Sequence, residues 1–126
     1  MPLNVLIVDD SEVMRWIILR ALRMSGLPVK EVMEAANGRQ ALDILSNHLI
    51  NLALVDINMP VMNGIEMIDK VRRRPEISDL PIIVVSAESS RTRIKILKEM
   101  GVGFVHKPFS AETLREAVFE LTGISQ

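Results

Sequence analysis

Short runs of β-branched and other apolar residues alternate along the chain with longer segments in which apolar residues recur every three or four positions. The short runs predict strands over residues 4–9, 29–36, 52–57, 81–87 and 103–107. The longer segments predict helices that begin near Ser11, Gly38, Gly64, Ser90 and Ser110. Strands and helices that alternate in this way, with short connections, favour right-handed crossovers and an α/β fold with an open, doubly wound parallel sheet.

The distribution of apolar residues within these segments indicates what each one buries. Residues 5–8 and 52–55 are apolar throughout, which is typical of strands that are covered on both faces by helices. We therefore expect three layers, α/β/α. In the first helix the apolar residues form a broad stripe, which we expect to pack in the interior. We expect the same of Trp16. The stripe comprises Val13, Met14, Ile17, Ile18, Ala21 and Leu22.

Size and composition restrict the number of domains and the kinds of partner and site that the chain can have. Its 126 residues, of which 48% are hydrophobic and 25% are charged, suit one domain over residues 1–126 and leave no room for a second. The formal net charge is −1, so no overall field favours nucleic acid or an anionic membrane as a partner. The chain has no cysteine, which excludes disulfides and thiolate zinc sites. Without a recognisable leader or a membrane-length apolar run, we expect a cytoplasmic protein.

Polar residues follow the predicted strands at one end. In open parallel sheets, binding sites form beyond the carboxyl ends of the strands. Asp9 and Asp10 end the first strand, and Asp56 ends the third. Ser86 ends the fourth strand and Lys107 ends the fifth. Neighbouring strands lie about 4.8 Å apart, so these side chains are expected to gather at one edge of the sheet.

This set of residue types favours phosphoryl chemistry. Three carboxylates in one site need a cation or raised pKa values to coexist, and Mg²⁺ takes carboxylate and phosphate oxygens as ligands. A hydroxyl from Ser86 and an ammonium from Lys107 suit a phosphoryl group. Carboxylates can act as nucleophiles that form an aspartyl phosphate. Asp56 is the best placed for that role, because it stands between the acidic pair and the Ser86–Lys107 pair.

The same residues carry a family resemblance over essentially the whole chain. Asp9-Asp10, Asp56 within "DINMPVMNG", Ser86 within "SAE" and Lys107 within "KPF" together resemble the receiver domain of two-component response regulators. The resemblance implies a flavodoxin-like (CheY-like) five-stranded sheet in the order 2-1-3-4-5, with five helices and no output domain. It also implies that Asp56 accepts a phosphoryl group from a phosphohistidine on a sensor histidine kinase or phosphotransfer protein.

The resemblance further assigns a metal site. It implies that Asp10 and Asp56 bind Mg²⁺ directly and that the backbone carbonyl of Asn58 is a third protein ligand. Asp9 would act mainly through a metal-bound water. Lys107 would pair with Asp56 or its phosphate, and the peptide bond between Lys107 and Pro108 is expected to be cis.

A conformational switch is also implied by the resemblance. Ser86 would turn toward the new phosphate, and the ring of Phe104 would move inward as Ser86 moves. Phosphorylation would thereby change the surface formed by the fourth helix, the fifth strand and the fifth helix, where family members contact targets or dimerise. We expect a monomer or a weak, phosphorylation-dependent dimer.

Other functions are compatible with parts of the pattern. A phosphatase of the haloacid dehalogenase type needs an acid two residues after its nucleophile, where this chain has Asn58. A flavodoxin needs a phosphate loop after the first strand, and "DDSEVM" has neither glycine nor threonine. Within the receiver family, a chemotaxis-type regulator, a phosphorelay intermediate and a phosphorylation-independent interaction module remain open.

Overall fold

The computed structural model describes residues 2–125 as strands and helices in strict alternation. The longest helix has 13 residues, and among the described residues no helix is both long and apolar enough to cross a bilayer. The elements are β1 (Leu3–Val8), α1 (Glu12–Met24), β2 (Val29–Ala35), α2 (Gly38–Asn47), β3 (Leu52–Val55), α3 (Gly64–Arg73), β4 (Ile82–Ser86), α4 (Arg91–Glu99), β5 (Gly103–His106) and α5 (Ala111–Thr122).

The five strands form one parallel sheet in the order β2-β1-β3-β4-β5. The predicted order and the predicted α/β class are therefore confirmed. Val8 at the end of β1 pairs with Val55 at the end of β3, and Ser86 at the end of β4 pairs with His106 at the end of β5. The residues that follow these strands consequently leave the sheet at the same edge.

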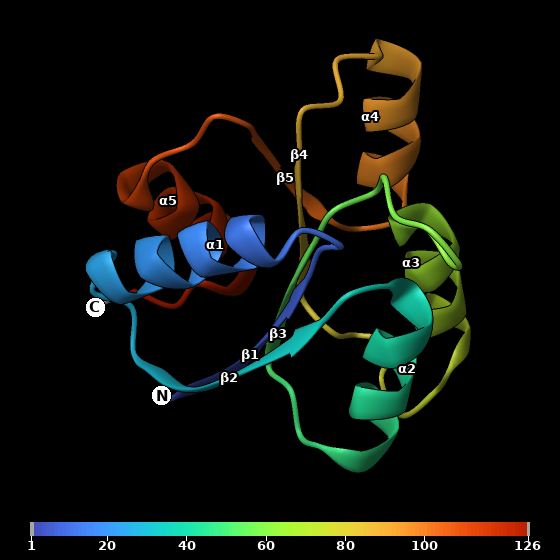
Figure 1. The fold of residues 1–126 in the computed structure, drawn as a ribbon, viewed down its shortest axis with the longest axis horizontal. Coiled ribbons are helices and arrows are strands. Elements are labelled where there is room, and N and C mark those ends of the chain that lie inside the picture. Colours follow the sequence, from blue (N-terminus) through green and yellow to red (C-terminus); the bar gives the residue numbers. More distant parts are fainter. Residues whose placement is uncertain (1, 126) are drawn as a thin grey trace.

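The helices cover both faces of the sheet, as Figure 1 shows: α1 and α5 lie on one side, and α2, α3 and α4 lie on the other. Each face has its own buried apolar cluster. On the α1/α5 face, Ile18 and Val118 pack with Ile7 of β1. On the opposite face, Met67 and Leu97 pack with Val8. β1 and β3 contribute to both clusters, which explains why their residues are apolar throughout.

Each helix begins at a side chain that caps it. Ser11, Asn37, Asn63, Ser90 and Ser110 each accept a hydrogen bond from a backbone N–H of the first turn that follows. Such caps satisfy N–H groups that have no partner within the helix. They place the helix starts where the sequence predicted them, and they keep the connections after the strand ends short.

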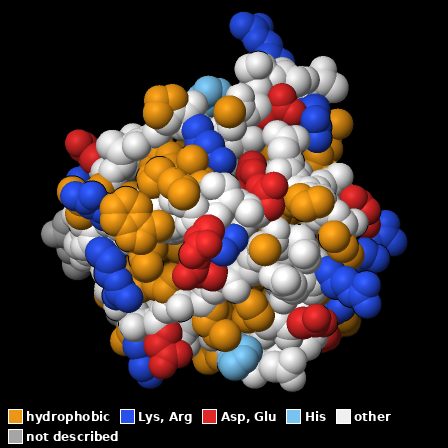
Figure 2. Space-filling view, in the orientation of Figure 1, with side chains coloured by type: hydrophobic (Ala, Val, Ile, Leu, Met, Phe, Trp, Pro, Cys, Tyr) orange, Lys and Arg blue, Asp and Glu red, His pale blue; other side chains and the backbone are white. Residues whose placement is uncertain are grey.

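The prediction for the first helix was wrong in part. Ile18 and Leu22 are buried, but Val13 is 68% exposed, Ile17 is 39% exposed and Trp16 is 57% exposed. With 3.6 residues per turn, Val13 lies about 140° around the helix from Ile18, so one packed face cannot bury both. The exposed apolar side chains are part of a patch over α1 in Figure 2, and the Arg20 guanidinium lies 5.5 Å from the Trp16 ring.

Candidate functional site

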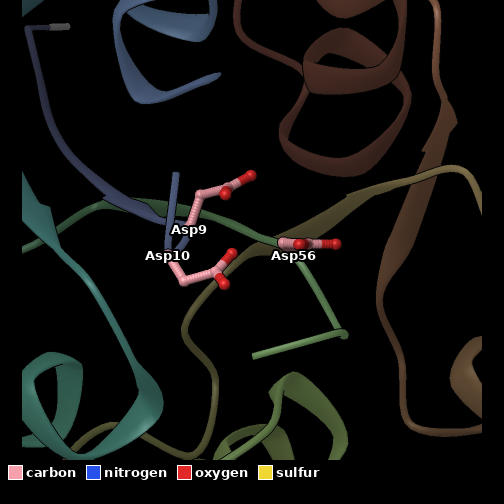
Figure 3. A group of neighbouring side chains, drawn as sticks. All are labelled: Asp9, Asp10 and Asp56. Atoms are coloured by element: carbon pink, nitrogen blue, oxygen red, sulfur yellow. The ribbon is translucent and has the colours of Figure 1, made fainter. Parts of the chain in front are cut away.

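Three aspartates meet at the carboxyl edge of the sheet. Asp9 and Asp10 follow β1, and Asp56 follows the adjacent strand β3 (Figure 3). One carboxylate oxygen from each lies within 4.8 Å of the other two. Asp9 and Asp56 are buried, whereas Asp10 is exposed. The sheet order thus brings together the acidic residues that the sequence singled out, and we call this group the acidic pocket.

Burial governs the charge of Asp56. Desolvation raises the pKa of this carboxyl above the ordinary value of 3.8, and the negative charge of Asp9 raises it further. The Lys107 ammonium and the backbone N–H groups of Asn58 and Ile57 lower the pKa, but the net result is a raised pKa. The carboxylate form of Asp56 is therefore held in the pocket at a cost in free energy, which a cation would offset.

Lys107 supplies the fixed positive charge of the site. Its Nζ lies 3.3 Å from Asp9 Oδ2 and 3.9 Å from Asp56 Oδ1, and its side chain is 19% exposed. The Lys107 backbone N–H donates to the Ser86 carbonyl at 2.9 Å, and the Lys107–Pro108 peptide bond is cis. The lysine therefore bridges two carboxylates, with the shorter contact to Asp9.

The acid pair is also held from the α1 side. The Ser11 backbone N–H donates to Asp9 Oδ1 at 2.9 Å, and Arg15 Nη1 donates to the Asp9 carbonyl at 2.7 Å. Arg15 was not singled out from the sequence. The signal that could have found it is an arginine on an otherwise apolar stretch of the helix, one turn beyond the capping Ser11.

Ser86 and Phe104 lie on the adjacent strands β4 and β5. Ser86 is fully buried, and its hydroxyl accepts a hydrogen bond from the Glu88 backbone N–H at 3.1 Å. Phe104 pairs in register with Val84 and packs, partly buried, against the apolar cluster beneath α2, α3 and α4. The structure therefore shows Ser86 bonded to the β4–α4 loop and the Phe104 ring at the margin of the core.

Glu88 organises the β4–α4 loop, a role that the sequence did not indicate. Its Oε2 accepts from the backbone N–H groups of Ser89 and Ser90 at 3.1 and 3.3 Å. Its Oε1 lies 3.0 Å from Arg93 Nη1, and the Glu88 side chain is only 16% exposed. A carboxylate bound at three points restricts the loop that also carries the bond to Ser86.

The β3–α3 loop shapes the other side of the acidic pocket. A Cβ at Gly64 would lie 2.4 Å from the Asp56 carbonyl oxygen and 2.8 Å from Ile57 Cα, so only glycine allows α3 to begin against this backbone. Within the loop, Val61 has φ of 69° and is 75% exposed. A β-branched residue in the left-handed region is strained.

The donor set of the acidic pocket fits a hard divalent cation. Mg²⁺ binds oxygen ligands at about 2.0–2.1 Å, so two oxygens on one ion lie at most about 4.2 Å apart. Carboxylate oxygens within 4.8 Å of one another need only a small inward movement to reach that spacing. Asn58 lies two residues after Asp56 in the β3–α3 loop and is exposed. The residues present therefore fit the Mg²⁺ site of a receiver domain.

Comparison with known proteins agrees with this site and this fold. The family model "Response regulator receiver domain" matches residues 5–119. The chain is 36% identical over 123 residues to a chemotaxis protein CheY homolog of Campylobacter jejuni, which covers 96% of this chain and 93% of that protein. It is 38% identical over 117 residues to the chemotaxis protein CheY of Pseudomonas aeruginosa, a match that covers 92% of this chain and 93% of that protein.

A solved structure gives the same result for the backbone. The chemotaxis response regulator CheY4 of Vibrio cholerae superposes with a TM-score of 0.83 at 33% sequence identity, and the match covers 96% of this chain and 99% of that one. Because the family model spans most of the chain and the relatives are similar over nearly their full lengths, the chain belongs to the response regulator receiver domain family, whose members are phosphoacceptor signalling proteins rather than enzymes.

Proposed function

We propose that Asp56 is the phosphoacceptor of a response regulator that is phosphorylated by a histidine kinase or a phosphotransfer protein. The observation that carries this proposal is the position of the Asp56 carboxylate between two further acids and the Lys107 ammonium, 3.9 Å from Asp56 Oδ1. Among the described residues, Lys107 is the one basic side chain that forms ion pairs with these carboxylates, so the pocket keeps excess negative charge. This arrangement suits a site that must hold a divalent cation and a phosphoryl group together.

The reaction follows from the groups present. An Asp56 carboxylate oxygen attacks the phosphorus of a phosphohistidine, the P–N bond breaks, and a P–O bond forms the aspartyl phosphate. The imidazole leaves with the electron pair of the broken bond. Lys107 then pairs with the phosphate, whose roughly two negative charges replace the single charge of the carboxylate. The electrostatic contribution of Lys107 therefore grows as the phosphoryl group arrives.

Mg²⁺ would be held by Asp10, Asp56 and the backbone carbonyl of Asn58, with Asp9 acting indirectly. When bound, it supplies positive charge that neutralises the oxygens of the transferring phosphoryl group. Asp9 is already paired with Lys107 at 3.3 Å and with the Ser11 N–H at 2.9 Å. These contacts leave Asp10 as the exposed member of the pair, which supports its assignment as the direct ligand.

Phosphorylation of Asp56 would then change the structure of the surface formed by α4, β5 and α5. We propose that Ser86 exchanges its bond with the Glu88 N–H for one with the phosphate, and that the Phe104 ring moves with it. A groove of about 620 Å³ on α4, β5 and α5 supports this route. Phe104 lines the groove together with Ile94, Lys98 and Leu121, so a change in the ring's position changes its shape. Phosphate would favour one of two populated states.

The receiver family implies a histidine kinase as one partner, and the exposed face of α1 supports a protein contact beside the site. Val13 and Trp16 are 68% and 57% exposed, and they lie within seven residues of Asp9 and Asp10 in a helix that follows the acid pair directly. Exposed apolar patches of this kind are typical of protein contacts.

The relatives named as chemotaxis proteins support a chemotaxis-type output by protein–protein contact at the α4–β5–α5 face.

The deciding experiment is phosphorylation by a small donor. The protein is incubated with acetyl phosphate, with and without Mg²⁺, and its mass is measured intact. One added phosphoryl group is expected with Mg²⁺ and none with EDTA. Asp56→Asn should take up no phosphoryl group, whereas Asp43→Asn, an exposed acid on α2, should behave as the wild type. A modified Asp56→Asn protein would overturn the assignment of Asp56.

The same experiment separates the alternative of a phosphorylation-independent interaction module. A module of that kind takes up no phosphoryl group under any of these conditions. If phosphorylation occurs, transfer from the phosphorylated protein to a phosphotransfer domain would distinguish a phosphorelay intermediate from a terminal regulator.

A further inference from the structure

Arg15 contacts the backbone of the acid pair and also β2. Its Nη1 donates to the Asp9 carbonyl at 2.7 Å, and its Nε lies 2.9 Å from Glu34 Oε1. The Arg15 side chain is only 16% exposed although it is charged. Both contacts are short and both use the planar guanidinium, so the group is held at two points.

The carbonyl that Arg15 holds belongs to the peptide unit between the two acids. A peptide unit is planar, so the position of the Asp9 carbonyl fixes the plane that runs from Asp9 Cα to Asp10 Cα. The Asp9 N–H donates to the Ala35 carbonyl at 3.1 Å, which anchors the preceding unit to β2. The direction in which the exposed Asp10 side chain leaves the backbone therefore depends on the Arg15 contact.

We infer that Arg15 is a positioning residue of the Mg²⁺ site, an inference that rests on the function proposed above. Glu34 holds the guanidinium in place, the guanidinium holds the peptide unit between Asp9 and Asp10, and that unit directs the two carboxylates toward Asp56. Arg15 itself contacts a carbonyl of the site and a carboxylate outside it, so it acts through the backbone and does not ligate the metal.

Charge and position predict opposite effects of removing Arg15. A positive side chain beside the pocket repels Mg²⁺. An arginine that acted only through its charge would therefore weaken Mg²⁺ binding, and Arg15→Gln would bind Mg²⁺ more tightly than the wild type. A positioning arginine strengthens binding, because the ligands are already directed at the ion. Arg15→Lys keeps the charge but cannot make both contacts of the planar fork. Both variants should therefore bind Mg²⁺ more weakly.

The test is the Mg²⁺ dissociation constant of each purified protein, measured by titration calorimetry, with far-UV circular dichroism to show that the variant is folded. Loss of one charge-assisted hydrogen bond should raise the constant about fivefold or more in Arg15→Lys and Arg15→Gln. The matched controls are Arg20→Lys and Arg20→Gln on the exposed side of the same helix, which should bind as the wild type.

Each outcome is decisive. A wild-type dissociation constant in folded Arg15→Lys, even with a lowered melting temperature, overturns the inference and leaves the proposed function intact, because Arg15 would then serve the fold alone. Tighter binding by Arg15→Gln overturns it in favour of a purely electrostatic role. If the wild-type protein binds no Mg²⁺, the proposed metal site fails and the inference fails with it.

Discussion

The Lys107 ammonium lies 3.3 Å from Asp9 Oδ2, although 98 positions separate these residues along the chain. They follow β5 and β1, which are not neighbours, since β3 and β4 lie between them. The long lysine side chain crosses that distance along the carboxyl edge and passes Asp56 at 3.9 Å. Lys107 thus holds the pocket together before any cation or phosphate is bound.

Replacing Lys107 should separate its two effects. Lys107→Gln removes a positive charge that competes with the cation, so Mg²⁺ should bind several-fold more tightly. The rate of phosphorylation by acetyl phosphate should fall about tenfold or more, because the phosphoryl group loses its ammonium partner. Calorimetry and intact-mass kinetics measure the two effects. Lys98→Gln at the end of α4 is the control, and weaker Mg²⁺ binding in Lys107→Gln would contradict the competition between Lys107 and the cation.

Asp56 should make the stability of the metal-free protein depend on pH. Burial raises the pKa of Asp56 in the folded state above 3.8, so in that pH range the native state binds more protons than the unfolded state. The contribution of Asp56 to the free energy of unfolding therefore falls as pH rises from about 3.8 through the raised pKa, and then stays constant.

The variant Asp56→Asn removes this dependence. At pH 7 without Mg²⁺ it should melt about 3 °C above the wild type, and the difference should shrink at pH values below 3.8. With saturating Mg²⁺ the wild type should melt at a higher temperature than Asp56→Asn, because only the wild type then gains a ligand. Thermal melts of both proteins, with Asp43→Asn as the charge-matched control, measure the effect. A lower melting temperature for metal-free Asp56→Asn would show that the buried carboxylate stabilises the fold.

Gly64 should be required for the position of the Asp56 backbone. In Gly64→Ala the new methyl group would meet the Asp56 carbonyl oxygen at 2.4 Å, and backbone atoms must move to admit it. We expect a loss of about 2–4 kcal/mol in the free energy of unfolding together with weaker Mg²⁺ binding. Gly101→Ala is the comparison, because its Cβ meets nothing within 4 Å and its cost comes only from φ of 75°. It should lose stability but keep its Mg²⁺ affinity.

Val61 offers a stabilising substitution. Its φ of 69° lies in the left-handed region, and its side chain is 75% exposed. Asparagine adopts this conformation more readily, so Val61→Asn should raise the free energy of unfolding by about 1 kcal/mol and the melting temperature by about 3 °C. Val13→Asn, at an exposed valine in α1, should give no such gain. Equal effects at the two positions would exclude backbone strain as the cause.

Arg93 should restrain the switch through Glu88. The Arg93–Glu88 pair, 3.0 Å long with an arginine that is 44% exposed, stabilises the loop whose Glu88 N–H binds Ser86. Such a pair contributes about 0.5 kcal/mol to the loop conformation in which Ser86 is bonded to Glu88. Arg93→Gln removes this contribution, so its affinity for beryllofluoride, measured in the presence of Mg²⁺, should be about twofold higher than that of the wild type. Arg91→Gln, on the same helix, should have wild-type affinity. Weaker binding by Arg93→Gln would reverse the role assigned to the pair.

Much of the site was predictable from local pattern. Asp9, Asp10, Asp56, Ser86 and Lys107 each follow an apolar strand run, and parallel strands bring such positions to one edge whatever their order. The caps at Ser11, Ser90 and Ser110 were predictable for the same local reason, because a capping side chain bonds to the first turn of its own helix.

Other features depend on how the elements and loops pack in the folded chain, and the local sequence pattern does not predict them. The apolar residues of α1 looked alike in the sequence, yet Ile18 is buried and Val13 is exposed, because the sheet covers only one side of the helix. The pairing of Glu88 with Arg93 and the close approach of Gly64 to the Asp56 carbonyl join residues near in sequence, but they depend on how each loop folds back, which residue spacing does not encode.

Periodicity and residue type were enough to predict the fold class, the edge of the sheet at which the polar residues gather and the oxygen chemistry that they offer. The folded chain was needed to show that Lys107 lies closer to Asp9 than to Asp56 and that Arg15 joins Glu34 to the acid pair. Such contacts depend on strand order and on how far side chains reach across the folded surface, which spacing along the chain does not encode.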